Sequence, residues 1–147
     1  MNSDVKTIVW VHGDCLSPHH PGLEAAPGAP TIFVWDDALL KEWRISLKRI
    51  VFIYECLLDL PVVIRRGDVA EQVVAFAHEH GATRILTAES PSPRFRKICK
   101  RIAGSMPSGS RLEVLRVEPL VDYDGYIDLK RFSRYWNTVR KYAFGGK

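Results

Sequence analysis

The chain has 147 residues, of which 46% are hydrophobic and 26% charged, and its formal net charge is +4 at pH 7. This is the composition of a soluble globular protein, and the mild positive charge permits an anionic partner such as a nucleotide without requiring one. The three cysteines are widely spaced, which excludes a disulfide framework and a zinc ribbon. The sequence shows neither the regions of a signal peptide nor an apolar run long enough for a membrane span, so we expect a cytoplasmic protein.

Five short segments rich in β-branched and aliphatic residues recur along the chain. Each is a nearly continuous apolar run, which is typical of strands buried on both faces in a parallel sheet. The runs are TIVWV (7–11), TIFVW (31–35), PVVIR (61–65), RILTA (84–88) and LEVLRV (112–117).

The segments between these runs carry helical patterns. Apolar residues recur every three or four positions over 38–59, and Asp36 or Asp37 is a candidate N-cap for that helix. Asp68 precedes a second helix in a sequence that resembles a capping box, and Gly81 is a natural stop for it. Further helices are expected over 93–104 and 127–142, with at most a short helix around 23–26.

Alternation of strands and helices predicts an α/β fold with right-handed crossovers. We expect one domain over residues 1–147, built as a three-layer, doubly wound, five-stranded parallel sheet of Rossmann-like type. The expected strand order is 3-2-1-4-5, which places the first strand in the centre. In such sheets ligands bind beyond the carboxyl ends of the strands, where the strand order reverses.

Polar residues follow two of the expected strands where each one ends. His12, Gly13 and Asp14 come after the first strand, and Glu89 and Ser90 come after the fourth. We therefore predict that these five residues contact a small ligand between loops 12–20 and 87–94. A structural interpretation stays open: Asp14 would bind backbone N–H groups in its turn, Gly13 would supply an unusual φ, and Ser90 or its neighbour Ser92 would cap the next helix.

The loop after the first strand also holds residues that can bind a transition metal. These are His12, Asp14, Cys15, His19 and His20, but their spacing matches no helix-borne pair and no zinc-finger pattern. The motifs GxGxxG, GxxxxGK[ST], GxSxG and HExxH do not occur, and no motif supports His12, Asp14 and Glu89 as an acid–base set. The sequence therefore assigns no metal and no catalytic residue, and it favours a binding role over an enzymatic one.

Several segments match the pattern of a known family. VWVHGDCLSPHHPGL (9–23) is similar to VWFRRDLRLxDNPAL, with matches at Val9, Trp10, Asp14, Pro21 and Leu23. The second strand segment, TIFVWDDALL, is similar to PVFVFDPxxL. Residues 65–86 are similar to RRGDPxEVLxxLAxExGAxxVY. Near the end, KRFSRYWNTVRKY is similar to YKVFTPFWxAWLK. By these segments nearly the whole chain resembles the N-terminal α/β domain of the photolyase/cryptochrome family.

The resemblance implies a nucleotide-binding type of α/β domain, which in some family members holds a deazaflavin, flavin or folate antenna chromophore. His12 and Gly13 stand where the family has paired arginines, and His19 and His20 where it has Asp-Asn. The chain ends about where the family's linker to its helical domain begins. Since that domain holds the repair FAD, we expect neither that FAD nor DNA photorepair from this chain alone.

Three functions follow as hypotheses, beside a stand-alone enzyme built on the acid–base set named above. The first is a non-catalytic module that binds a nucleotide or a flavin-type or folate-type chromophore. The second is a structural or partner protein with a vestigial cleft, which associates with itself or with a separate subunit through Tyr135, Trp136 and Tyr142. The third is nucleic-acid binding, for which solvated faces of amphipathic helices are the simpler explanation. The basic clusters behind it are Arg94, Arg96, Lys97, Lys100 and Arg101, and Lys130, Arg131, Arg134, Arg140 and Lys141.

Overall fold

The computed structural model describes residues 5–42, 45–117 and 132–143. The chain divides into two compact units, Met1–Val117 and Glu118–Lys147. The single-domain organisation over residues 1–147 stays a prediction. Among the described residues, no helix has the length and apolar character needed to cross a membrane.

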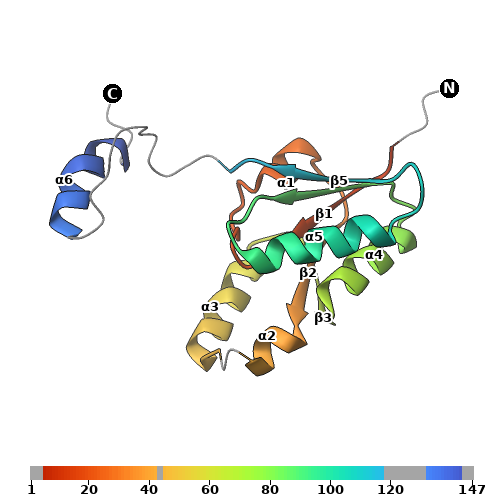
Figure 1. Cartoon of the computed structure of the whole chain (residues 1–147), viewed down its shortest axis with the longest axis horizontal. Coiled ribbons are helices and arrows are strands. Elements are labelled where there is room, and N and C mark those ends of the chain that lie inside the picture. The colour runs from red at the N-terminus through yellow and green to blue at the C-terminus, as the bar shows by residue number, and fades with distance from the viewer. Residues whose placement is uncertain (1–4, 43–44, 118–131, 144–147) are drawn as a thin grey trace. The chain divides into compact units, whose positions relative to one another are not determined.

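Five parallel strands form the sheet of the first unit in the order β3-β2-β1-β4-β5 (Figure 1). The predicted α/β class and the strand order 3-2-1-4-5 are therefore confirmed. The third strand begins two residues later than expected, because the Val62 N–H bonds to the Leu60 carbonyl in a turn just before it. The strands are β1 (Thr7–Val11), β2 (Thr31–Asp36), β3 (Val63–Gly67), β4 (Arg84–Ala88) and β5 (Arg111–Leu115).

Helices cover both faces of this sheet. They are α1 (Pro21–Ala25), α2 (Asp37–Glu42), α3 (Leu47–Leu58), α4 (Val69–Glu79) and α5 (Pro93–Ser105), and the second unit contains α6 (Phe132–Ala143). Trp10 packs in a core with residues of α4 and α5, whereas its neighbours Val9 and Val11 pack with α1 and α3 on the other side. This alternation follows from the two-residue period of a strand and confirms the three layers.

One predicted helix is two helices in the structure. The segment 38–59 is interrupted, because the Asp36 carboxylate caps α2 by accepting from the Ala38 and Leu39 N–H groups at 2.9 and 3.3 Å, and Ser46 starts α3 by accepting from the Arg49 N–H at 3.3 Å. The predicted apolar stripe of this segment also does not face the core throughout. Of its six described members, Leu57 is buried and Ile50 is half-buried. The other four, Leu47, Val51, Tyr54 and Leu58, are exposed.

Other helix signals are confirmed. Asp68 caps α4 by accepting from the Glu71 N–H at 3.0 Å, and Gly81 ends that helix region with a φ of +61°. The short helix predicted around 23–26 is α1. Residues 127–131 of the last predicted helix lie outside the described residues, and the helix is described from Phe132.

Candidate functional site

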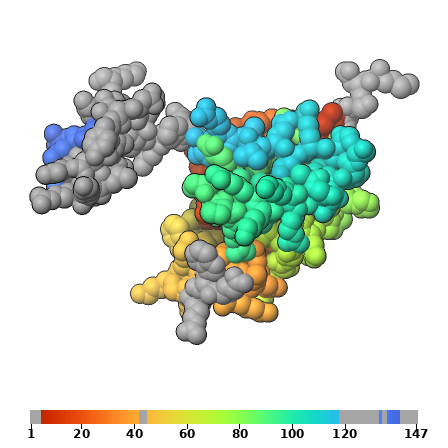
Figure 2. Space-filling view, viewed as in Figure 1, coloured from red at the N-terminus to blue at the C-terminus, as the bar shows by residue number. Residues whose placement is uncertain are grey.

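A cavity of about 430 Å³ lies at the carboxyl ends of β1 and β2. Its rim comes from the loop after β1, from α2 and α3, and from the first turns of α5. Figure 2 shows the surface of α5 in green to cyan above that of α2 and α3 in orange to yellow. A volume of this size at this edge of a parallel sheet is typical of small-molecule sites.

Aromatic side chains form much of the cavity wall. Trp10 and Phe95 are stacked, with ring centroids 5.6 Å apart and an interplanar angle of 20°. Phe33 and Trp35 meet edge to face at 5.2 Å, and aliphatic side chains such as Ile53 also line the cavity. Walls of this kind accept a flat, weakly polar ring system.

His12 lines the cavity but uses both of its ring nitrogens within the fold. Nε2 lies 2.6 Å from the Ala88 carbonyl, and Nδ1 accepts from the Asp14 N–H at 3.3 Å. Only an N–H can donate to a carbonyl, so we assign the proton to Nε2 of a neutral ring. Burial lowers the pKa of His12, which outweighs the opposite effects of the Ala88 carbonyl and the Asp14 carboxylate. His12 thereby joins the end of β1 to the end of β4.

The structure places the predicted site residues in three different environments. His12, Gly13 and Asp14 line the cavity. Ser90 lies beside them, where its hydroxyl donates to the Asp14 carboxylate at 2.5 Å. Glu89 is not part of the cavity wall, because its carboxylate accepts from the Val117 N–H at 3.0 Å and its own N–H donates to the Leu115 carbonyl at 2.9 Å. The loops after β1 and β4 therefore bond to each other, and the cavity opens on the β2 side of them.

Of two expectations about these loops, the one for Gly13 is wrong, and the one for Ser90 or Ser92 as the cap of α5 is met only in the position of Ser92. Gly13 is not among the described glycines with positive φ, and a Cβ built on it meets nothing within 4 Å. Ser90 does not cap α5. Ser92 occupies the N-cap without a side-chain hydrogen bond to the first turn, and its N–H donates to the Ser90 hydroxyl at 3.2 Å.

The remaining histidines of the loop serve the fold. His19 is an exposed partner of Glu24 at 3.2 Å. His20 is fully buried, its Nδ1 accepts from the Gly22 N–H at 3.0 Å, and its Nε2 has no hydrogen-bond partner in the part of the chain that is described. Burial, with a smaller effect from His12, lowers the pKa of His20 to about 4. Among the described residues, no three His, Cys, Asp or Glu side chains are grouped to hold a metal ion.

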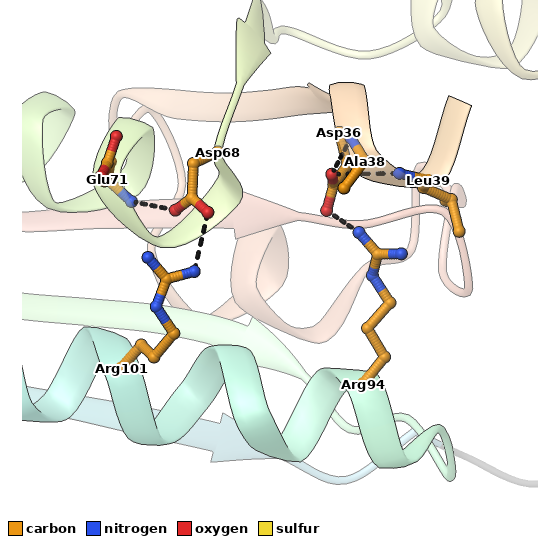
Figure 3. A network of polar contacts seen from close by, with 7 residues as sticks. All are labelled: Asp36, Ala38, Leu39, Asp68, Glu71, Arg94 and Arg101. Atoms are coloured by element: carbon orange, nitrogen blue, oxygen red, sulfur yellow. Dashed lines mark hydrogen bonds and ion pairs between the residues drawn. The ribbon is translucent and has the colours of Figure 1, made fainter. Parts of the chain in front are cut away.

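Charged residues at the cavity rim were not predicted as part of a site. Asp36, the last residue of β2, forms an ion pair with Arg94 of α5 and lines the cavity (Figure 3). Arg49 of α3 also lines the cavity, is exposed and forms no ion pair with a described residue. The sequence signal for Asp36 was available, since the second strand also ends in a polar residue.

Comparison with known proteins identifies no family for this chain. No family model matches it, and no curated protein matches it. Among solved structures, 47 chains match this one. One of them is described as "Structure-based assignment of the biochemical function of hypothetical protein MJ0577: A test case of structural genomics". It is 12% identical, the match covers 78% of this chain and 98% of that chain, and the TM-score is 0.48.

The predicted resemblance to the photolyase/cryptochrome family is wrong, because no model of that family matches the chain. The structure explains the RRGD segment without it. Arg65 forms two hydrogen bonds with Glu79 at 2.9 and 2.6 Å, Gly67 has a φ of +140°, and Asp68 caps α4. The segment thus joins a strand to a helix, which any sheet of this type requires.

Proposed function

We propose that the first unit is a binding module for a small molecule that combines a planar aromatic ring with an anionic group, as a nucleotide does. The observation that carries this proposal is the cavity of about 430 Å³ at the carboxyl ends of β1 and β2. Its size and position suit a ligand of this class, since doubly wound sheets bind their ligands at this edge.

The wall of the cavity supports the ring part of the ligand. Trp10, Trp35 and Phe95 supply aromatic surface, and His12 meets the Trp10 and Phe95 rings at 5.5 and 5.1 Å. A flat heteroaromatic ring gains dispersion and offset-stacking contacts against such groups. A flexible aliphatic ligand would gain less from the same surface.

The charges at the rim support the anionic part. The Asp14 carboxylate accepts from Ser90, and the Asp36 carboxylate is occupied by Arg94 and two backbone N–H groups. Two arginines line the cavity, and Arg49, unlike Arg94, forms no ion pair with a described residue. The first turn of α5 also opens onto the cavity and has no side-chain cap, so its N–H groups favour a negative group.

The arrangement favours binding over catalysis. A general base needs a free lone pair within reach of the substrate, and His12 uses both nitrogens inside the fold. Asp14 and Asp36 are likewise engaged. The alternative is a partner protein whose cavity is vestigial, and it differs from the binding module in predicting no ligand affinity.

The test is a titration of the full chain with AMP and FMN, and in parallel with adenosine and riboflavin. Binding is followed by calorimetry and by the fluorescence of the four tryptophans, two of which, Trp10 and Trp35, line the cavity. We expect saturable binding of at least one phosphorylated ligand and weaker binding of the compound without phosphate. No heat and no fluorescence change with all four would overturn the proposal and leave the partner protein.

A cavity-filling variant locates the binding. Gly13→Leu adds a side chain where a Cβ meets nothing within 4 Å and where the cavity lies, so we expect it to abolish binding without unfolding the protein. Gly104→Leu is the matched control, since a Cβ on this residue of α5 also meets nothing within 4 Å and the residue does not line the cavity. Equal affinity of the two variants would place the ligand elsewhere.

A further inference from the structure

Four apolar side chains of α3 form an exposed stripe with the spacing of a coiled-coil seam. Leu47, Val51, Tyr54 and Leu58 follow one another at intervals of four, three and four residues. Their exposed fractions are 75%, 45%, 48% and 64%. Apolar residues that recur every 3.5 positions on average are the pattern by which one helix packs along another. We call these four residues the α3 seam.

The α3 seam is not the face by which α3 rests on its own sheet. Ile53 and Leu57 pack into the core between α3 and the sheet, and Leu57 is 1% exposed. The seam residues lie beside this face, so they stay exposed although α3 is already packed on its own sheet. Exposed apolar surface in a continuous stripe of this kind marks an interaction site.

Charges beside the α3 seam indicate its occupant. Lys48 and Glu55 are seven residues apart, so they lie on the same edge of the seam, two turns from each other. Both are exposed, and neither forms an ion pair with a described residue. If two such helices pack antiparallel about a two-fold axis, Lys48 of each copy lies opposite Glu55 of the other. Parallel packing offers no such exchange.

We propose that the α3 seam pairs antiparallel with the same seam of a second copy of this chain. The contact is self-complementary, as a two-fold interface must be: Leu47 meets the Leu58 end of the other helix, and Val51 meets Tyr54. This proposal does not rest on the proposed function. Arg49 is two residues from both Leu47 and Val51, so it projects away from the seam and the cavity stays accessible in the dimer.

The length of α3 sets the strength of the dimer. Twelve residues at a rise of about 1.5 Å give a contact only about 18 Å long. Such a seam buries less than the roughly 800 Å² per partner of a standard interface. We therefore expect a reversible dimer that dissociates in the micromolar range.

The test is sedimentation equilibrium of the full chain from low micromolar to near-millimolar concentration. We expect a monomer–dimer equilibrium. Lys48→Glu or Glu55→Lys alone should weaken it by about tenfold, because two attractive pairs become repulsive. The double variant with both changes should regain the affinity of the unchanged chain. Lys97→Glu, on the exposed surface of α5, is the matched control and should have no effect.

Three results would overturn the proposal. The first is a monomer at every concentration, which is expected if another protein or another part of the chain covers the seam. The second is a dimer that Lys48→Glu does not weaken. The third is a failure of the double exchange to restore dimerisation although circular dichroism shows the fold intact. Gly13→Leu, which fills the cavity, should leave the dimer unchanged, so the two proposals fail independently.

Discussion

Arg94, in the first turn of α5, forms an ion pair with Asp36, the last residue of β2 (Figure 3). The same carboxylate caps α2 by accepting from the Ala38 and Leu39 N–H groups. Two turns further along α5, Arg101 repeats the arrangement with Asp68, the cap of α4, at 2.7 Å. One face of α5 thus holds the N-termini of two other helices, and the first of these contacts forms part of the cavity rim.

The two capping aspartates should differ in their contribution to stability. The side chains of Asp36 and Arg94 are 13% and 31% exposed, against 38% and 53% for Asp68 and Arg101. Loss of either cap costs about 1 kcal/mol, but an exposed ion pair adds little, whereas a half-buried arginine left without its partner costs more. We expect Asp36→Ala to lower the free energy of unfolding by about 2–3 kcal/mol and Asp68→Ala by about 1 kcal/mol in urea titrations. Equal losses would show that the pair with Arg94 contributes nothing.

Most of the fold could be predicted because its signals are local. Continuous apolar runs marked the five strands, and Asp68 and Gly81 marked the start and stop of α4. The break between α2 and α3 was missed for the opposite reason. Apolar residues keep a helical spacing across it, and Ser46, the N-cap that starts α3, looks like any polar residue in the middle of a helix.

The site could be predicted only in part. Polar residues after β1 and β4 pointed to the edge of the sheet where the cavity lies, and three of the five line it. The side on which the cavity opens depends on which loop atoms bond to each other. His12 bonds to Ala88 and Asp14 to Ser90, which closes the space between β1 and β4 and leaves it open toward β2. These contacts join residues that are distant in the sequence, so no local pattern of residues predicts them.

Two helical glycines should respond oppositely to the same substitution. A Cβ on Gly22 of α1 would lie 2.8 Å from a methyl of the buried Val9, and 3.1 Å from the His20 ring. Val9 is a stiff side chain in the centre of the sheet, so Gly22→Ala should cost about 1–3 kcal/mol. Gly104→Ala in α5 meets no atom and should stabilise the fold by about 0.5–1 kcal/mol. Thermal unfolding of both variants checks the signs, and a stabilised Gly22→Ala would contradict the packing described for α1.

Stability should fall in mild acid because of His20. The buried ring has a pKa of about 4, below its ordinary value of 6.5, so the unfolded chain binds a proton that the folded chain does not. The stability that the neutral His20 ring contributes is therefore fully present above pH 6.5. It is lost progressively as the pH falls from 6.5 toward 4. The size of the shift corresponds to about 3 kcal/mol. Protonation would also remove the hydrogen bond from the Gly22 N–H to Nδ1.

His20→Asn isolates this contribution. His20 is the N-cap of α1. Asparagine is also a good N-cap, because its side-chain oxygen accepts from the first turn, and it does not titrate. We expect the variant to be less stable at neutral pH but to lose less stability between pH 6.5 and 4 than the unchanged chain, as measured by urea unfolding across that range. His12, whose pKa is also lowered by burial, is present in both proteins, so it cancels in the comparison. Parallel pH profiles would show that His20 is not buried as a neutral ring.

Arg49 should decide whether the ligand's anionic group matters. It lines the cavity, it is exposed, and it has no ion pair among the described residues. Arg49→Gln keeps a polar, unbranched side chain, although a shorter one, and removes the charge. The affinity for AMP or FMN should therefore fall about tenfold while that for adenosine or riboflavin is unchanged. Arg96→Gln on α5, exposed and outside the cavity, is the matched control. Calorimetry at low and high salt adds a second check, because a phosphate bound at Arg49 loses affinity as salt screens the charge. An equal loss for all four ligands would mean that Arg49 shapes the cavity and does not bind the anion.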